Sequence, residues 1–296
     1  MLANDSTIEP TLAFTGVRFG YGREPVLDGF DLALRPGEIT LLAAPNGTGK
    51  TTALWIAAGL LRPQRGTVRV FGRDPFRDRG VLDRVGFVAE GAPLPDSWSA
   101  DAVLAFQRDS FSKWDEDECN RLVRSFRLDT RKRVRELSRG QRGKLALAAV
   151  LASRPELLLL DEPTLGLDVA TRRVLLSELL AGVAEHGCPI LLTGHEIAEA
   201  EAVVERIVLV DHGKVIHDER VDDLLSRYRI LAWEQPTPVP PADLDLVYLP
   251  WALGRRALAQ DWNEDVARLW LAQGGRVERA DLETVYLALT GELAYA

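Results

Sequence analysis

The chain has 296 residues, a formal net charge of −8 and two cysteines, Cys119 and Cys188. The acidic balance argues against a surface that binds nucleic acid, so we expect no nucleic acid among the partners. The two cysteines lie far apart without the spacing of a metal site, which suits a reducing compartment and a structural role for both. A chain of this length buries roughly 75% of its unfolded surface and needs no cross-links.

We expect no membrane-directed segment in this sequence. Residues Met1–Pro10 are polar and acidic, and they lack the apolar core of a secretory signal. No window approaches 18 uninterrupted apolar residues, and the strongly apolar piece Leu157–Leu160 has only the length of a strand. If the protein works at a membrane, another polypeptide must span it.

The first predicted elements are short strands between residues 12 and 34, where apolar residues alternate. Turns are predicted at Gly20–Gly22 and Arg35–Glu38, so the strands should form an antiparallel layer. Tyr21 lies in the first turn, where an aromatic ring could stack on a purine base. A plain surface ring is the alternative for Tyr21, and Phe19 is the competing candidate for stacking.

A strand-like run, Ile39–Leu42, is followed by the loop Ala44–Thr52 and by a helical run from Thr51 to Leu60. This order of strand, loop and helix is what makes a glycine-lysine-threonine string a phosphate-binding loop. Gly47 and Gly49 allow the backbone to curl and direct N–H groups at phosphate oxygens, and the start of the helix adds its positive dipole end. An ordinary glycine turn before a helix is the alternative.

Ala44 stands where the phosphate-loop pattern has glycine. In a left-handed conformation alanine would cost about 1–2 kcal/mol. In an extended conformation the cost would be near zero. We expect the second case, because the tight part of the loop lies at Gly47–Gly49.

Polar residues follow three predicted strands. These strands are residues 85–88, 157–160 and 190–192. Glu90 follows the first strand, Asp161 and Glu162 the second, and His195 the third. The carboxyl ends of strands in an open α/β sheet meet at the edge where ligands bind. Adjacent carboxylates at the end of a buried strand suit a cation or a reactant, because their uncompensated burial is expensive. The plain alternatives are a helix-capping acid at 161–162, a solvated loop acid at Glu90 and a structural histidine.

The apolar period between residues 97 and 154 is helical and predicts a helical insert. The insert contains Leu137–Gln141, which precedes a helix rich in alanine and leucine, and the basic run Arg131–Arg135. A solvated face is the simpler interpretation of the basic run. Contact with a partner or with lipid headgroups is the alternative.

Taken in order, these motifs resemble the ATP-binding subunit of an ABC transporter, from about residue 12 to residue 217. The resemblance rests on seven motifs in the family's order and spacing: Tyr21, Gly49–Thr52, Glu90, Leu137–Gln141, Leu157–Glu162, Leu167–Asp168 and His195. Two further segments, Phe111–Asp115 and Asp281–Gly291, look like the bacterial exporter branch. Its members include antibiotic- and peptide-resistance transporters with the membrane subunit on a separate chain.

The resemblance implies that the bound nucleotide is ATP. Tyr21 would stack on adenine, and Lys50 would contact the β- and γ-phosphates. The segment Ser138–Gln141 would face the nucleotide of a second subunit, with Asp168 at the contact between the subunits. The implied nucleotide contacts are Tyr21, Asn46, Gly47, Thr48, Gly49, Lys50, Thr51, Thr52, Ser138, Arg139, Gly140, Gln141 and Asp168.

The resemblance also implies Mg²⁺ held by Thr51 and Asp161, with Glu90 as a further ligand. Glu162 would polarise the attacking water. His195 would contact the γ-phosphate and keep the water and Glu162 in line. Glu90 completes the implied catalytic set with Glu162 and His195.

Two of these residues depart from the family's pattern. Arg139 stands where the signature commonly has glycine, and a cation near a neighbouring γ-phosphate is not unfavourable. Glu90 stands where the family usually has glutamine. A carboxylate binds a cation more strongly than an amide oxygen does, but it repels the γ-phosphate. We interpret Glu90 as a variant of the coupling site rather than as the mark of an inactive one.

The expected fold is α/β: a P-loop NTPase core with an antiparallel β subdomain and a helical insert at about 97–154, plus a small C-terminal α+β-like extension. We expect the ATPase domain at residues 1–220 and the extension at 221–296. Within the extension we predict four features: the strand Ile230–Trp233, the proline-rich break Glu234–Pro241, and helices at Asn263–Ala272 and Asp281–Leu289.

The implied function is ATP hydrolysis that powers export through a separate permease at the cytoplasmic face of the membrane. Two copies of the chain, expected to form a homodimer, would close head to tail on two ATP molecules. The apolar candidates for contact with the permease are Leu94, Trp98, Phe106, Phe111 and Trp114. A soluble ABC ATPase without a membrane partner and a regulatory cassette of a heterodimer are the alternatives.

Overall fold

The computed structural model describes residues 9–45, 47–194, 197–234, 246–249, 255–260, 262 and 264–290. The chain divides into two compact units. The first comprises Met1–His195 and Arg206–Asp218, and the second Glu196–Glu205 and Glu219–Ala296. The expected boundary at residue 220 stays a prediction, and the division assigns Glu196–Glu205 to the second unit.

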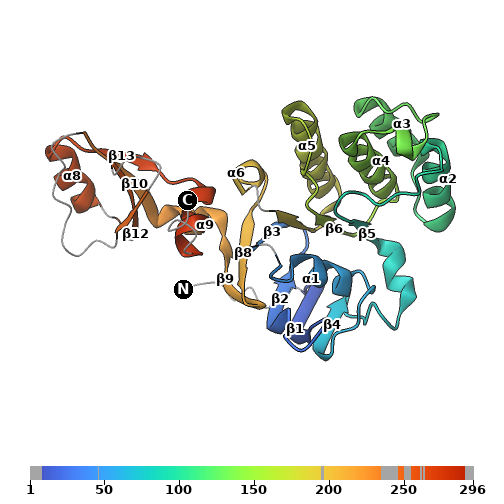
Figure 1. Cartoon of the computed structure of the whole chain (residues 1–296), viewed down its shortest axis with the longest axis horizontal. Coiled ribbons are helices and arrows are strands. Elements are labelled where there is room, and N and C mark those ends of the chain that lie inside the picture. The colour runs from blue at the N-terminus through green and yellow to red at the C-terminus, as the bar shows by residue number, and fades with distance from the viewer. Residues whose placement is uncertain are drawn as a thin grey trace. The chain divides into compact units, whose positions relative to one another are not determined.

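A three-stranded antiparallel sheet forms one end of the first unit (Figure 1). Its order is β2 (Leu27–Leu34), β1 (Leu12–Phe19) and β4 (Arg65–Val70). The alternating residues of β1 and β2 are buried on one face, as period-2 patterning requires. The predicted antiparallel layer is therefore confirmed.

The centre of the first unit is a six-stranded sheet. Its order is β5 (Val85–Val88), β6 (Leu157–Asp161), β7 (Ile190–Gly194), β3 (Ile39–Ala43), β8 (Arg206–Asp211) and β9 (Lys214–Arg220). The pairs from β5 through β8 are parallel. Every residue of β3 and β6 is buried, which explains their continuous apolar runs. Parallel pairing brings the carboxyl ends of β3, β6 and β7 to one edge of the sheet.

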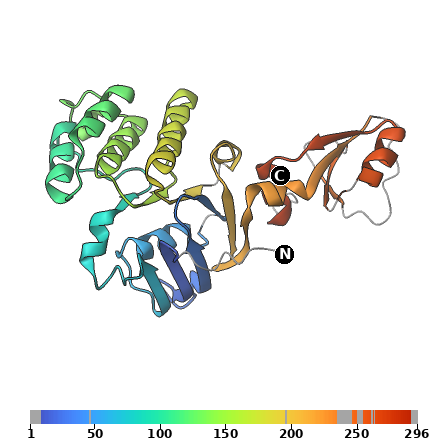
Figure 2. The ribbon, with the colours of Figure 1, turned by 180° about the vertical axis from the view of Figure 1, so that it is seen from behind.

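Three helices form the predicted insert: α2 (Ala100–Ser110), α3 (Glu116–Ser125) and α4 (Arg139–Ala152). Side chains of Ser99, Asp115 and Ser138 accept backbone N–H groups at the three starts, so each helix begins at a polar cap. The insert has its own core, which includes Val103, Cys119 and Leu145. Figures 1 and 2 show this helical group on the other side of the parallel sheet from β1, β2 and β4.

Two further helices flank the central sheet. Helix α1 (Lys50–Ala57) follows the phosphate loop and contacts β4 and β6. Helix α5 (Val169–His186) follows β6, and Asp168 is its N-cap residue. Two short 3₁₀ turns, η1 (Arg79–Arg84) and η2 (Val134–Glu136), complete the regular structure of the first unit.

The second unit is α+β, as predicted. Its antiparallel sheet has the order β11 (Leu246–Tyr248), β12 (Arg256–Gln260), β10 (Tyr228–Ala232) and β13 (Arg276–Arg279), and its helices are α6 (Ile197–Ala200), α7 (Val221–Ser226), α8 (Glu264–Ala272) and α9 (Leu282–Leu289). The rings of Trp233 and Trp270 meet edge to face at 5.7 Å in its core. Most of the proline-rich break, residues 235–241, lies outside the described residues.

Within the described part of the chain, no helix combines the length and the apolar character that crossing a membrane requires.

Candidate active site

The loop between β3 and α1 depends on glycine at two positions. Gly47 and Gly49 have φ angles of 83° and 104°, in the region that favours glycine. Gly49 is the N-cap residue of α1. A Cβ atom on Gly49 would lie 2.7 Å from the Leu27 side chain and 2.9 Å from the Val26 carbonyl oxygen. The loop can therefore curl tightly only with glycine at position 49.

Lys50 folds back over this loop. Its ammonium Nζ donates to the carbonyl oxygen of Ala44 at 2.5 Å and reaches that of Pro45 at 3.4 Å. The hydroxyl of Thr48 also donates to the Pro45 carbonyl, at 2.6 Å. Ala44 is buried and is not among the residues with positive φ, so it avoids the left-handed conformation in which alanine would be costly. Alanine at this position is therefore compatible with an intact loop.

Asp161 and Thr51 come together at the carboxyl edge of the sheet. Oδ1 of Asp161 accepts the Thr193 hydroxyl at 2.7 Å and the Thr51 hydroxyl at 3.2 Å. Oδ2 of Asp161 is buried without a hydrogen-bond partner among the described residues. An unpaired buried oxygen of this kind costs about 1–3 kcal/mol. A carboxylate oxygen and a hydroxyl oxygen are ligands that suit Mg²⁺, so the donor set at this edge fits that ion.

A hydrogen bond to Thr193 fixes the backbone of Glu162. Its N–H donates to the Thr193 hydroxyl oxygen at 3.1 Å, and its φ is 49°, a value that non-glycine residues rarely adopt. Residues held in such conformations gather at functional sites, because the surrounding structure has to enforce them. Thr193 therefore contacts both carboxylate residues at the end of β6.

A cleft of about 380 Å³ lies over the phosphate loop. Its lining residues are Tyr21, Val26, Gly47, Gly49, Lys50, Thr51, Thr52, Trp55, Glu90 and Glu162. Six of the predicted site residues line this cleft together with Glu90 and Glu162. The phosphate loop, two acids that follow strands and the aromatic ring therefore open into one space. Trp55 also lines the cleft and was not predicted, although it follows Thr51 by four residues and so shares its helix face.

Tyr21 stands at the rim of this cleft. Its side chain is 63% exposed, and its hydroxyl lies 3.3 Å from the Thr52 hydroxyl. The ring of Phe19 supports it edge to face at 5.1 Å. Phe19 itself belongs to the buried core, which leaves Tyr21 as the exposed ring beside the loop.

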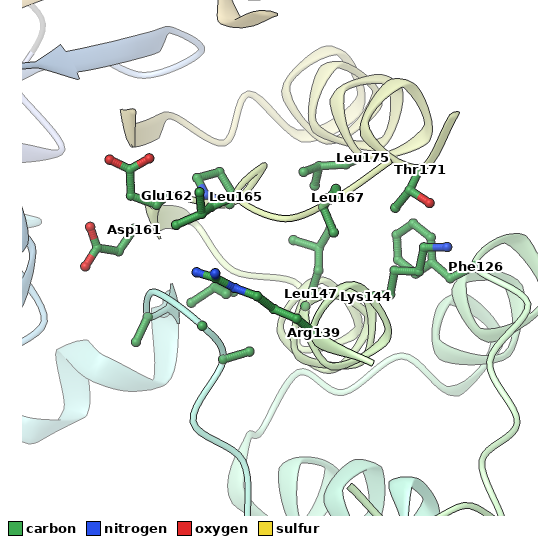
Figure 3. A pocket seen from close by; sticks show the side chains of 16 residues that line it. Phe126, Arg139, Lys144, Leu147, Asp161, Glu162, Leu165, Leu167, Thr171 and Leu175 are labelled. Atoms are coloured by element: carbon green, nitrogen blue, oxygen red, sulfur yellow. The ribbon is translucent and has the colours of Figure 1, made fainter. Parts of the chain in front are cut away.

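Figure 3 shows a second, smaller cavity next to Asp161 and Glu162. Arg139 extends from the start of α4 toward these two carboxylates (Figure 3). Its Nη2 lies 3.7 Å from Oε1 of Glu90. Glu162 lines both this cavity and the cleft, so the two spaces share one wall.

Two helix starts involve predicted site residues: Ser138, in the signature segment Ser138–Gln141, caps α4, and Asp168 caps α5. Ser138 and Gln141 form a capping box, in which Gln141 N–H donates to Ser138 Oγ at 3.2 Å and Ser138 N–H donates to Gln141 Oε1 at 3.0 Å. Asp168 accepts the hydroxyl and the backbone N–H of Thr171, at 2.6 and 2.9 Å. These bonds lower the pKa of Asp168. The segment starts a helix, as predicted.

The structure therefore groups some of the predicted site residues and separates others. Tyr21, the loop glycines, Lys50, Thr51, Thr52, Glu90 and Glu162 line the cleft, with Asp161 bonded to Thr51 below it. The described lining residues of the cleft do not include Ser138–Gln141 or Asp168. Asn46 and His195 lie outside the described residues.

Comparison with known proteins identifies the family. Residues 27–165 match the sequence family described as "ABC transporter". The chain is 36% identical over 226 residues to the Nod factor export ATP-binding protein I of Paraburkholderia xenovorans, covering 74% of this chain and 73% of that protein. The chain belongs to the ATP-binding proteins of ABC transporters.

Other relatives are named for drug resistance or for import rather than for export. The daunorubicin resistance ATP-binding protein DrrA3 of Streptomyces coeruleorubidus is 35% identical, with 73% of this chain and 70% of the relative covered. The aliphatic sulfonates import ATP-binding protein SsuB of Corynebacterium glutamicum is 33% identical, with 73% and 86% covered. The family is therefore shared by importers and exporters.

Solved structures agree with the ABC assignment. The ATP-binding subunit of an ABC transporter matches with a TM-score of 0.68 and 26% identity, covering 73% of this chain and 92% of that one. The ATP-binding cassette MJ0796, solved as a dimer in a post-hydrolysis state with ADP and Pi, matches with a TM-score of 0.63 and 23% identity, over 71% and 98% of the two chains. The expected P-loop fold is confirmed, and the protein is an ATP-binding ATPase of this family.

Proposed function

We propose that this chain hydrolyses ATP to power export through a separate membrane permease, at the cytoplasmic face of the membrane. The observation that carries the proposal is the cleft in which Lys50, Thr51 and Glu162 face one space, with Asp161 bonded to Thr51. Export is favoured over import because the Nod factor and daunorubicin resistance relatives are named as exporters or resistance proteins. The segments Phe111–Asp115 and Asp281–Gly291 support the same branch.

In this proposal the cleft takes ATP with its adenine on Tyr21. The exposed ring, supported by Phe19, offers a flat apolar face at little conformational cost. Backbone N–H groups of the curled loop surround the phosphates, with Lys50 on the β- and γ-phosphates. The loop residues proposed for this task are Asn46, Gly47, Thr48, Gly49, Lys50, Thr51 and Thr52.

Thr51 and Asp161 would hold Mg²⁺, with Glu90 as a further ligand. The buried, unpartnered Oδ2 of Asp161 supports this assignment, since a hard cation would satisfy it. When bound, the ion would neutralise charge that develops on the phosphate oxygens. Thr193 keeps Oδ1 of Asp161 engaged, so Oδ2 remains the oxygen available to a ligand.

Glu162 would polarise the attacking water. It lines the cleft beside Lys50 and Thr51, which is where the terminal phosphate of a bound ATP would lie. Its backbone is fixed through Thr193, so the carboxylate starts from a defined position. His195 is proposed to hold the water and Glu162 in line, and Glu90 to report the state of the site to the insert.

A second copy of the chain would complete each nucleotide site. Ser138, Arg139 and Asp168 are exposed, and the start of α4 presents backbone N–H groups and a positive dipole end. We assign Ser138, Arg139, Gly140 and Gln141 to the nucleotide of the opposite subunit, and Asp168 to the contact between subunits. ATP held from both sides would stabilise the closed dimer by mass action.

The permease would dock on the helical insert. Of the five apolar candidates, Trp98 and Phe106 are exposed, at 37% and 55%, and their rings meet at 5.4 Å. Leu94 and Trp114 pack against the core of the insert, and Phe111 is half-buried. The docking surface is therefore centred on the pair Trp98 and Phe106.

The test is to purify the chain from its native membranes in mild detergent and to measure ATP turnover. We expect an integral membrane protein to copurify and turnover to be stimulated by it. Turnover without any membrane partner would favour a soluble ABC ATPase, and no turnover by the chain alone would favour a regulatory cassette. As the control, Lys50→Ala should abolish nucleotide binding in a calorimetric titration, and unchanged affinity would reject the assigned phosphate loop.

A further inference from the structure

Glu90 and Arg139 form an ion pair between two segments of one subunit. Glu90 follows β5, and Arg139 is the first residue of α4. Their charged groups lie 3.7 Å apart, and their side chains are 53% and 52% exposed. The pair joins the wall of the nucleotide cleft to the segment that we assign to the opposite nucleotide.

The direction of Arg139 is set by Gly166. A Cβ atom on Gly166 would lie 3.0 Å from Cδ and 3.4 Å from Nε of Arg139. The stem of the arginine therefore lies across the backbone of Gly166, where a larger residue would push it aside. From this position the guanidinium points into the cavity beside Asp161 and Glu162 (Figure 3).

The segment after Glu90 is attached to the segment before α4. Val134 N–H donates to the Trp98 carbonyl at 2.8 Å, and Arg135 N–H donates to the Asp96 carbonyl at 3.2 Å. Arg142, one turn along α4 from Arg139, pairs with the Asp96 carboxylate at 3.2 Å. Two arginines of the first turn of α4 thus hold two acids of the same loop.

We propose that Arg139 is a positioning residue that acts through Glu90 inside its own subunit. Its guanidinium partly neutralises the Glu90 carboxylate, which would otherwise repel the phosphates of a bound nucleotide. Glu90 lines the cleft with Lys50 and Thr51, so an uncompensated carboxylate there would repel nucleotide phosphates. The guanidinium offsets that charge. The proposal rests on the nucleotide cleft proposed above, and it adds a role for Arg139 that requires no second subunit.

The size of the effect follows from the exposure of the pair. Both side chains are about half exposed, so solvent screens the pair and its contribution to binding is small. Removing the guanidinium should therefore weaken nucleotide binding about two- to fivefold at low salt. The effect should shrink as salt screens the carboxylate.

The test is calorimetric titration of the full chain with Mg·ADP at a concentration where the chain is monomeric by light scattering. ADP lacks the γ-phosphate that a second subunit would contact, so the titration reports the role of Arg139 within one subunit. The variants are Arg139→Met, Glu90→Gln and the double variant. Arg142→Met is the matched control, since it removes the same charge from the same helical turn without touching Glu90.

We expect Arg139→Met to weaken Mg·ADP binding two- to fivefold, and to have no effect when Glu90 is already Gln. Arg139→Lys, which keeps the charge, should retain most of the affinity, and Arg142→Met should bind like the wild type. The proposed role of Arg139 would be overturned if Arg139→Met weakened binding equally with Glu90 and with Gln at position 90, or if the single variant bound Mg·ADP with unchanged affinity. A wild-type chain that binds no Mg·ADP would instead overturn the proposed function.

Discussion

The hydroxyl of Thr193 donates to Oδ1 of Asp161 at 2.7 Å, and the threonine side chain is completely buried. The same hydroxyl oxygen accepts the backbone N–H of Glu162 at 3.1 Å. One side chain at the end of β7 therefore positions both acidic residues at the end of β6 through hydrogen bonds. A relationship of this kind depends on the parallel pairing Asp161↔Thr193, which puts the two residues side by side.

Thr193→Val should destabilise the fold through the loss of the hydroxyl alone. The substitution keeps the size of the side chain but leaves Asp161 Oδ1 and the Glu162 N–H with one partner fewer. We expect a loss of about 1–3 kcal/mol in the free energy of unfolding, because both groups are buried or partly buried. Urea unfolding measures this loss, and Thr193→Ser, which keeps the hydroxyl, is the control. Equal stability of the Val and Ser variants would contradict the role of the hydroxyl.

Glu162→Gln should slow hydrolysis while nucleotide binding survives. The amide keeps the shape of the side chain but cannot take up a proton from water, which we expect to lower kcat about 10²–10⁴-fold. ATP-bound dimers should then accumulate, and size-exclusion chromatography with Mg·ATP would detect them. Hydrolysis at the normal rate would show that Glu162 is not the base.

Gly49→Ala and Gly47→Ala should differ although both glycines have positive φ. At Gly49 the added Cβ would meet Leu27 and the Val26 carbonyl oxygen within 3 Å, whereas at Gly47 no described atom lies within 4 Å of it. Gly47→Ala should therefore cost only the strain of its backbone, about 1–2 kcal/mol. Gly49→Ala should also displace the loop and lose Mg·ADP affinity. Thermal unfolding and nucleotide titration of the two variants would test this, and equal affinities would count against it.

Glu156 should contribute to stability against acid. Hydrogen bonds from Arg84, and then from Lys113, lower the pKa of Glu156 from 4.5 to about 2. A carboxylate with a depressed pKa stabilises the fold above its unfolded value, so this contribution is complete above pH 4.5 and is lost as pH falls toward 2. We expect no more than about 1 kcal/mol, since the pairs are partly exposed. The free energy of unfolding of Glu156→Gln should be lower than that of the wild type at pH 7, and the two values should converge near pH 2. A constant difference at all pH values would contradict the assignment.

The two thiols should be inert in the folded protein. Burial raises the pKa of Cys119 to about 11 and that of Cys188 to about 12. At pH 8 almost no thiolate forms, and the side chains are covered. A colorimetric disulfide reagent should therefore react with neither cysteine until urea unfolds the chain, and then with both. Rapid reaction of the folded protein would contradict a purely structural role.

Local pattern was sufficient for most of the elements. The strand Val85–Val88 agrees with the prediction, and helices at Glu264–Ala272 and Leu282–Leu289 were predicted within two residues of their ends. The insert was predicted as helical because its period is carried by neighbours three and four residues apart. Strands β8 and β9 were not predicted, although residues 207–210 of β8 are apolar and a turn follows this strand.

Some residues of the candidate site were predicted from the sequence, and others were not. Glycines and acids at the ends of strands carry a local signal, so Gly49, Lys50 and Asp161 could be named from their neighbours alone. Trp55 and Thr193 carry no such signal. Their contact with the site arises from the face of α1 and from the pairing of β6 with β7.

The sequence by itself determined that this chain has a phosphate loop, strand-end acids and a signature segment in the order of an ABC ATPase, because each motif lies within a few consecutive residues. Only the tertiary structure decided that Thr193 holds Asp161, and that Arg139 lies against Glu90 although 48 residues separate them in the chain. Contacts between residues so far apart depend on how strands pair and helices pack, and no local pattern encodes the distance between two particular side chains.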